Sequence, residues 1–202
     1  MDIKESTFSP VLTTPANQKV LDLVKQKCSQ AAAPLAHVAK AGAEAVHTFT
    51  FDIGSLQDFS SKDIWTDAAH SAVFDQLAAI KGPVVYFFEI TSSISPAEVL
   101  SAAEAYKGGS RIMPAFRSNP DNTSQVLYVG KVKSNFRARV VQHLGFSKTA
   151  ATQGLQMYHW TRGLDLKVEL TVLEFKVDMA DLLPLIEKAI ATQLKPLLGK
   201  HQ

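Results

Sequence analysis

The residues whose types and spacing suit chemistry lie at positions 126–145, which read VLYVGKVKSNFRARVVQHLG. A short apolar run ends here at Tyr128 and Gly130, and a helical pattern that carries Arg139 and His143 follows. Because residues four apart lie on one face of a helix, we expect these two side chains to approach the same ligand. A planar arginine fork matches two phosphate oxygens, so a phosphate group is the expected ligand.

Positive charge is concentrated in the same segment. The whole chain has 21 Lys and Arg against 19 Asp and Glu, but residues 131–148 contain no acidic side chain. Lys131 is a candidate phosphate contact, and Lys133 and Arg137 are expected to contact a nucleic-acid backbone without reading bases. Gly130 is expected to turn the chain out of its strand, where a side chain would block a phosphate. A solvated basic helix face explains the charge equally well.

Regular elements must position these residues, and the hydrophobic pattern predicts three strands in the second part of the chain. Each is an apolar run of strand composition. The runs cover residues 84–90, 126–129 and 166–177. Alternation with predicted helices indicates a small α/β domain with a three-stranded sheet flanked by helices.

Two of those helices carry end signals. Ser95 stands at an N-cap position, with Pro96 at the first helical position and Glu98 at the capping-box position. The helix after residue 129 is expected to start at Ser134 as its N-cap and to end at Gly145.

The rest of the chain is expected to be mostly helical. Helical patterns cover residues 16–40, where Pro34 interrupts or kinks the run, and residues 63–80 and 178–194. The alternating segment 45–53 is rich in β-forming residues. Apolar runs are far shorter than the ~20 residues of a membrane span, and the first residues lack a signal-peptide core. We therefore expect no membrane association and a cytoplasmic location.

Four segments together resemble the GIY-YIG nuclease family: VVYFFEI, LYVGK, RARVVQH and LIEKAIATQLKPLLG. The resemblance covers roughly residues 82–199. Tyr86 matches the tyrosine of the family's first strand, and residues 128–130 match its Tyr-Ile-Gly triplet. Arg139, eleven residues past Tyr128, matches the family's arginine, and Glu187 matches the glutamate of its later helix.

The resemblance implies a metal-dependent endonuclease that hydrolyses DNA phosphodiester bonds. Residues 82–202 would form the nuclease domain, with an insertion at about 92–124, and residues 1–81 a helical N-terminal extension. Glu187 would hold a Mg²⁺ ion. The site would also contain Tyr86, Tyr128, Arg139 and His143.

The sequence departs from the family pattern at three places. The first motif lacks the family's glycine, and about forty residues separate Tyr86 from Tyr128, far more than in compact members. Gly199 stands where the family often has asparagine. Two alternatives therefore stay open: a nucleic-acid-binding module on this fold without catalysis, and a structural or interaction protein.

Two further features bear on function. The single cysteine, Cys28, excludes an intramolecular disulfide and a cysteine-based zinc site. The cluster His159, Trp160 and Arg162 either contacts nucleic acid or belongs to the core. The sequence indicates no particular oligomeric state.

Overall fold

The computed structural model describes residues 15–59 and 62–200, and the chain divides into two compact units, Met1–Lys40 and Ala41–Gln202. The described part of the first unit lies in one long helix, α1 (Pro15–Ala41), which runs through Pro34 without ending there. Val20, Leu21 and Val24 on this helix are exposed. No helix in the described ranges has the length and apolarity that a membrane crossing requires.

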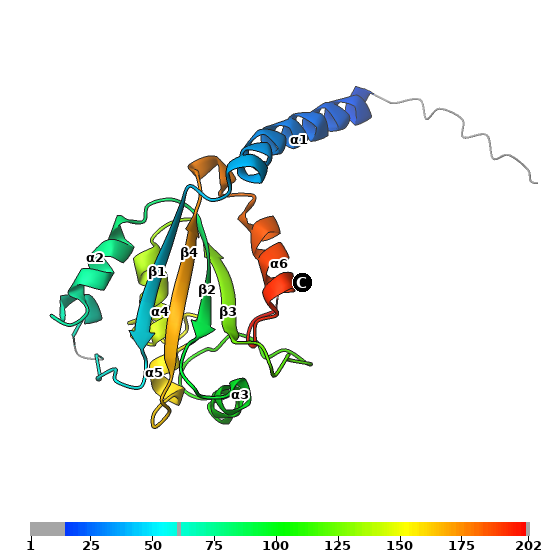
Figure 1. The fold of residues 1–202 in the computed structure, drawn as a ribbon. Coiled ribbons are helices and arrows are strands. Elements are labelled where there is room, and N and C mark those ends of the chain that lie inside the picture. Colours follow the sequence, from blue (N-terminus) through cyan, green and yellow to red (C-terminus); the bar gives the residue numbers. More distant parts are fainter. Residues whose placement is uncertain (1–14, 60–61, 201–202) are drawn as a thin grey trace, which may run out of the picture. The chain divides into compact units, whose positions relative to one another are not determined.

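The second unit is built on a four-stranded antiparallel sheet in the order β1-β4-β2-β3 (Figure 1). The strands are β1 (Ala45–Asp52), β2 (Val84–Ile90), β3 (Val126–Val132) and β4 (Lys167–Glu174). The prediction of three strands is wrong because β1 pairs along its whole length with β4. The compact units accordingly divide after Lys40, whereas the sequence predicted a division after residue 81.

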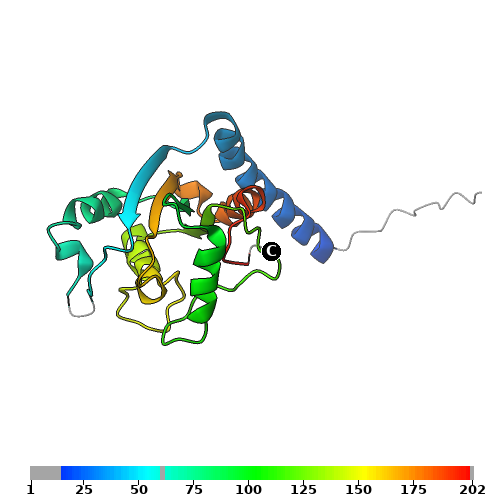
Figure 2. The ribbon, with the colours of Figure 1, turned by 60° about the horizontal axis from the view of Figure 1, so that its bottom comes forward.

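Helices cover both faces of this sheet. Figure 1 shows α2 and α4 on one face and α6 on the other, and Figure 2 shows α3 and α5 at the end of the sheet where β2 stops. Alternate residues of β1, β2 and β4 fill the space beneath α2 and α4, among them Phe49, Tyr86, Phe88, Leu170 and Val172. The helices are α2 (Ser71–Ala79), α3 (Pro96–Ala105), α4 (Phe136–Leu144), α5 (Met157–Trp160) and α6 (Leu183–Leu194).

Helix ends follow local chemistry with one exception. The capping box of α3 is confirmed, since the Ser95 hydroxyl accepts from the Glu98 amide and the Glu98 carboxylate accepts from the Ser95 amide. Gly145 ends α4 with a φ of 107°, as expected. The expected N-cap Ser134 is wrong, because Asn135 takes that place in the left-handed region with a φ of 56° and makes no side-chain cap bond.

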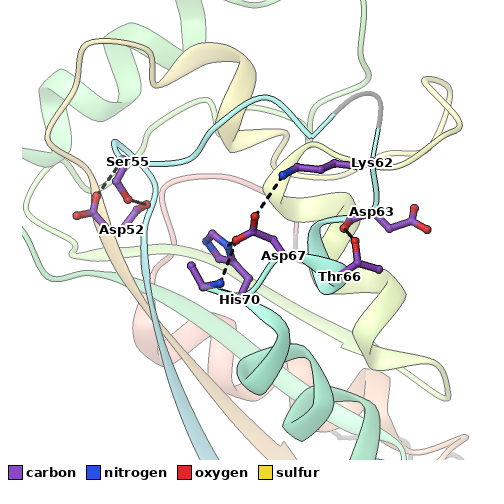
Figure 3. A network of polar contacts seen from close by, with 8 residues as sticks. Asp52, Ser55, Lys62, Asp63, Thr66, Asp67 and His70 are labelled. Atoms are coloured by element: carbon purple, nitrogen blue, oxygen red, sulfur yellow. Dashed lines mark hydrogen bonds and ion pairs between the residues drawn. The ribbon is translucent and has the colours of Figure 1, made fainter.

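The segment 63–80 is not one helix. It forms a 3₁₀ turn, Ile64–Thr66, and then α2, which starts at Ser71. Asp67 lies in the break, and its carboxylate accepts from the Ala69 amide, the His70 ring and the Lys62 ammonium (Figure 3). A short acidic side chain that satisfies nearby backbone donors competes with helix formation, which explains the interruption.

Other strands and helices begin or end at residues that differ from the predicted ones. β3 continues to Val132, so Gly130 lies inside the strand and not at its end. β4 is shorter than the predicted 166–177, and a 3₁₀ turn, Val177–Met179, delays the last helix to Leu183. Leu166 nevertheless stays in the core.

Glu174 holds β1 and the start of β2 to the end of β4. Its carboxylate accepts from the backbone amides of Lys81 and Gly82 and lies 3.1 Å from the His47 ring nitrogen Nε2. Burial raises the pKa of this carboxyl, but the hydrogen bonds from Gly82, His47 and Lys81 outweigh it, and the net pKa lies below the ordinary value. The ionised form is thus part of the fold.

The pKa of Glu174 is lower in the folded protein than in the unfolded chain. Its contribution to the free energy of unfolding is therefore complete at pH values above the ordinary glutamate pKa, and it is lost as the pH falls through the pKa of the folded protein. We expect Glu174→Gln to lower the free energy of unfolding at neutral pH, and we expect its difference from the wild type to shrink as the pH falls below about 4.3. Urea unfolding at several pH values measures this. A difference that stays constant with pH would contradict the role of the charge.

Candidate active site

The candidate site straddles the edge strand β3. Tyr86 pairs with Gly130 and Phe88 with Tyr128, so both tyrosines lie on the sheet face that α4 covers. Lys131 alternates to the other face, where it pairs with Glu187 of α6. Residues 127–128 include a break in register, since Phe88 pairs with Tyr128 and Glu89 with Val126. Such bulges often lie beside functional sites.

Tyr86 is the centre of a buried hydrogen-bonded network. Its hydroxyl oxygen lies 2.8 Å from His143 Nε2 and 3.0 Å from Arg139 Nε. The Leu155 amide donates to His143 Nδ1 at 3.1 Å, so the neutral ring carries its proton on Nε2. Both Nε2–H and the guanidinium therefore donate to the phenol oxygen and fill its two lone pairs.

His143 cannot approach a ligand as expected. The side chain is 0% exposed, beneath the rings of Tyr86, Phe88 and Tyr128. Burial and the nearby Arg139 charge place its pKa well below the ordinary value. The expected approach of His143 to a ligand is therefore wrong, and His143 instead holds the Tyr86 hydroxyl.

Burial also keeps both tyrosines protonated. It raises the pKa of Tyr86 and of Tyr128, and the charge of Arg139 offsets only part of that effect. Tyr86 is fully buried, whereas Tyr128 is partly exposed. Of the two tyrosines, only Tyr128 lines a pocket, and its hydroxyl is hydrogen-bonded to Arg139.

Arg139 is fixed by four groups, one of which is the Tyr128 hydroxyl. Besides Nε on Tyr86, its Nη1 donates to Gln142 Oε1 at 3.0 Å and to the Gln153 carbonyl at 2.6 Å. The loop 153–155 therefore holds Arg139 through a carbonyl and His143 through an amide. Gly154 lets this loop approach, because a Cβ there would lie 2.8 Å from the Gln142 carbonyl oxygen.

Gly130 has a different role from the expected one. It lies within β3, and a Cβ there would lie 2.6 Å from the Tyr86 hydroxyl oxygen and 2.7 Å from Tyr128 Cε1. Real Cβ atoms do not approach so closely. The glycine thus makes room for the Tyr86 hydroxyl, and the turn out of the strand comes after Val132.

On the outer side of β3 a pocket of ≈ 480 Å³ opens between the strand and α6. Tyr128, Lys131 and Glu187 line it, together with Gln153. The Glu187 carboxylate pairs with the Lys131 ammonium, and its charge is felt by both tyrosines. Glu187 therefore faces the same pocket as Tyr128, whereas Tyr86, Arg139 and His143 are not among its lining residues.

Two predicted binding residues lie elsewhere. Lys133 is largely exposed and pairs with Asp181 outside the pocket. Arg137 points away from Arg139, and its guanidinium carbon lies 5.4 Å from the centre of the Trp65 ring. An arginine and a lysine in these environments do not converge with the others on one ligand.

The segment after Pro196 closes part of the strand edge. The amides of Leu197 and Leu198 donate to the carbonyls of Val126 and Leu127, and the Gly199 amide donates to Ala115. Gly199, which has a φ of 98°, thereby lines the pocket where the family often has asparagine. Sequence patterns gave no signal for the contributions of Gln153 and Ala115.

The side chains at the pocket suit a metal ion that keeps most of its ligands as water. In residues 15–59 and 62–200 no group of three or more His, Cys, Asp and Glu side chains is arranged to hold a metal. Mg²⁺ keeps several waters and needs only one or two protein carboxylates, so Glu187 in an open polar pocket fits it. Comparison of the chain with protein-family models, curated proteins and solved structures gives no match.

The close fit over Gly130 is testable. We expect Gly130→Ala to displace the Tyr86 ring and to lower the free energy of unfolding by about 1–3 kcal/mol, as overpacking in a core does. In a Tyr86→Phe background the same change should cost less, since one of the close contacts is gone. A double-mutant cycle by urea unfolding measures this coupling; additive effects would show that the hydroxyl does not set the requirement for glycine.

The neutral His143 makes a second test. Because its folded-state pKa is depressed, its contribution to stability is complete above about pH 6.5 and falls below it, by up to about 1.4 kcal/mol per pH unit. We expect His143→Gln to lack this part of the decline between about pH 6.5 and pH 5.5. Unfolding curves of wild type and variant that stay parallel over this range would mean that His143 binds its proton equally well in the folded and the unfolded protein, which would contradict a neutral buried ring.

Proposed function

We propose that the chain is a metal-dependent endonuclease that hydrolyses DNA phosphodiester bonds. The observation that carries the proposal is that Tyr128 and Glu187 line one pocket beside β3, while Arg139 of α4 is hydrogen-bonded to Tyr128. Phosphodiester hydrolysis needs a cation for the charge that builds on the phosphoryl oxygens and an activated water. Arginine and a carboxylate-bound metal ion are suited to these two tasks.

The residues divide into groups that touch the substrate and groups that position them. Arg139 would contact the phosphate, and Tyr128 would orient the attacking water through its neutral hydroxyl. Tyr86 and His143 are buried, so they keep the guanidinium in place and do not contact DNA. This fixed orientation matters, since preorganised charge needs no rearrangement during the reaction.

Glu187 would hold the Mg²⁺ ion in the ≈ 480 Å³ pocket. The ion would supply charge to the phosphoryl oxygens and acidify a bound water. Lys131 pairs with the carboxylate in this structure, so it would move from Glu187 to a phosphate oxygen when the ion binds. The candidate binding residue Lys131 thus has two alternative anionic partners in one pocket.

The same ion pair favours a second candidate function. A lysine that neutralises the only pocket carboxylate leaves the site positive without any metal, which suits a nucleic-acid-binding module that has no catalysis. Nicking of supercoiled plasmid in Mg²⁺ separates the two functions. DNA binding without any nicking would support the binding module and overturn the nuclease.

The carboxylate provides the sharpest test of catalysis. We expect Glu187→Gln to reduce Mg²⁺-dependent nicking by at least about a hundredfold, because the amide cannot replace the charge that the ion needs. Asp181→Asn is the matched control, since Asp181 also pairs with a lysine but does not line the pocket. Equal activity of the two variants would remove Glu187 from the mechanism.

A further inference from the structure

Three hollows on the second unit are neighbours that share lining residues. The ≈ 480 Å³ pocket at β3 shares Pro114, Ala115 and Lys200 with a neighbouring hollow of ≈ 460 Å³. That hollow shares Arg111 with a third one of ≈ 400 Å³ beside the end of α4. We refer to the three together as the groove. Its middle part is formed by residues 107–116, within the segment that the resemblance marks as an insertion.

Basic side chains follow the whole groove. The middle hollow is lined by Lys107, Arg111 and Lys200, and among its described lining residues none is acidic. Arg111 is held in place by its Nη1, which donates to the Ser147 carbonyl at 2.8 Å. The two outer hollows also contain acidic side chains, Glu187 in one and Asp58 and Asp63 in the other. The basic residues along the groove outnumber them and are Lys131, Lys188, Lys200, Lys107, Arg111, Lys148 and Lys62.

The far end of the groove is aromatic. Phe146 and Tyr158 line the third hollow as partly exposed rings, and their centroids are 4.9 Å apart. The Arg162 guanidinium carbon lies 5.0 Å from the centre of the Tyr158 ring, and buried Phe59 supports Phe146 edge-on. Of the basic and aromatic cluster in the sequence, Trp160 belongs to the core, while His159 lines this hollow.

We propose that the groove binds a single-stranded stretch of nucleic acid that leads away from the scissile phosphate. This inference rests on the proposed function. Basic side chains that track a backbone, together with rings on which bases stack, are the features that bind single strands. A base paired in a duplex is stacked between its neighbours and cannot offer its face to Tyr158. The preferred substrate would accordingly be a duplex with an unpaired tail or gap next to the cleaved bond.

Fluorescence anisotropy in EDTA tests binding without cleavage. The probes are a blunt DNA duplex and the same duplex with a single-stranded tail of about six nucleotides on either the 5′ or the 3′ strand. We expect one tailed duplex to bind about tenfold more tightly than the blunt one, since stacking of even one base gives an effect of this order. Equal affinity for all three duplexes would overturn the proposal.

Variants locate the effect within the groove. Tyr158→Ala should abolish the preference for the tail, and Tyr158→Phe, which keeps the ring, should retain it. Thermal unfolding confirms that each variant is folded. A Tyr158→Ala protein that is folded and still prefers the tail would overturn the stacking role.

Variants of exposed lysines that lie outside the core test the role of positive charge in the middle of the groove. Lys107→Gln with Lys200→Gln should reduce the salt dependence of log K for the tailed duplex by about 1.5 in slope. The control is Lys167→Gln with Lys176→Gln, two paired lysines outside the groove, which should leave the slope unchanged. Equal slopes for the two double variants would contradict the proposed path.

The outcomes separate this inference from the nuclease assignment. Tail preference without nicking supports the groove and overturns the nuclease. Nicking without tail preference supports the nuclease and overturns the groove. Absence of both binding and nicking overturns the two together.

Discussion

The Tyr86 hydroxyl is the constraint on which the rest of the site depends. It is buried within the sheet unit, and a buried hydroxyl must find hydrogen-bond partners. Arg139 and His143 supply two donors, which requires an uncharged imidazole and a guanidinium aimed inward at Nε. The same hydroxyl occupies the volume above Gly130. One polar atom in an apolar core thus determines the residue types at three positions on β3 and α4.

The site uses the edge of the sheet to combine two chemical environments. On the α4 face, Tyr86 and His143 are dry and neutral, which gives Arg139 a rigid support. On the α6 face, Lys131 and Glu187 border an open pocket where ions and water can exchange. Alternation along β3 allows residues three positions apart, Tyr128 and Lys131, to take part in both. A central strand could not do this, since its neighbours would cover the space beside it.

Local signals in the sequence were sufficient for part of this arrangement. The capping box at Ser95 and the end of α4 at Gly145 depend on a few adjacent residues, so they were predicted correctly. β1 was missed as a member of the sheet because its partner β4 lies more than a hundred residues away. The candidate residues could be selected from their spacing in the sequence. The buried position of His143, however, includes a hydrogen bond from the Leu155 amide, and the space above Gly130 is filled by the Tyr86 side chain of another strand. Neither contact leaves a pattern in the sequence.

The strand edge beside Val126 and Leu127 is covered by Leu197 and Leu198, whose amides donate to the carbonyls of these two strand residues. An edge strand with unpaired backbone groups is a template for a strand of another molecule, and covering the edge prevents such association. The pocket wall at Gly199 follows directly on this cover. The same short segment thus shields the sheet from association and bounds the pocket.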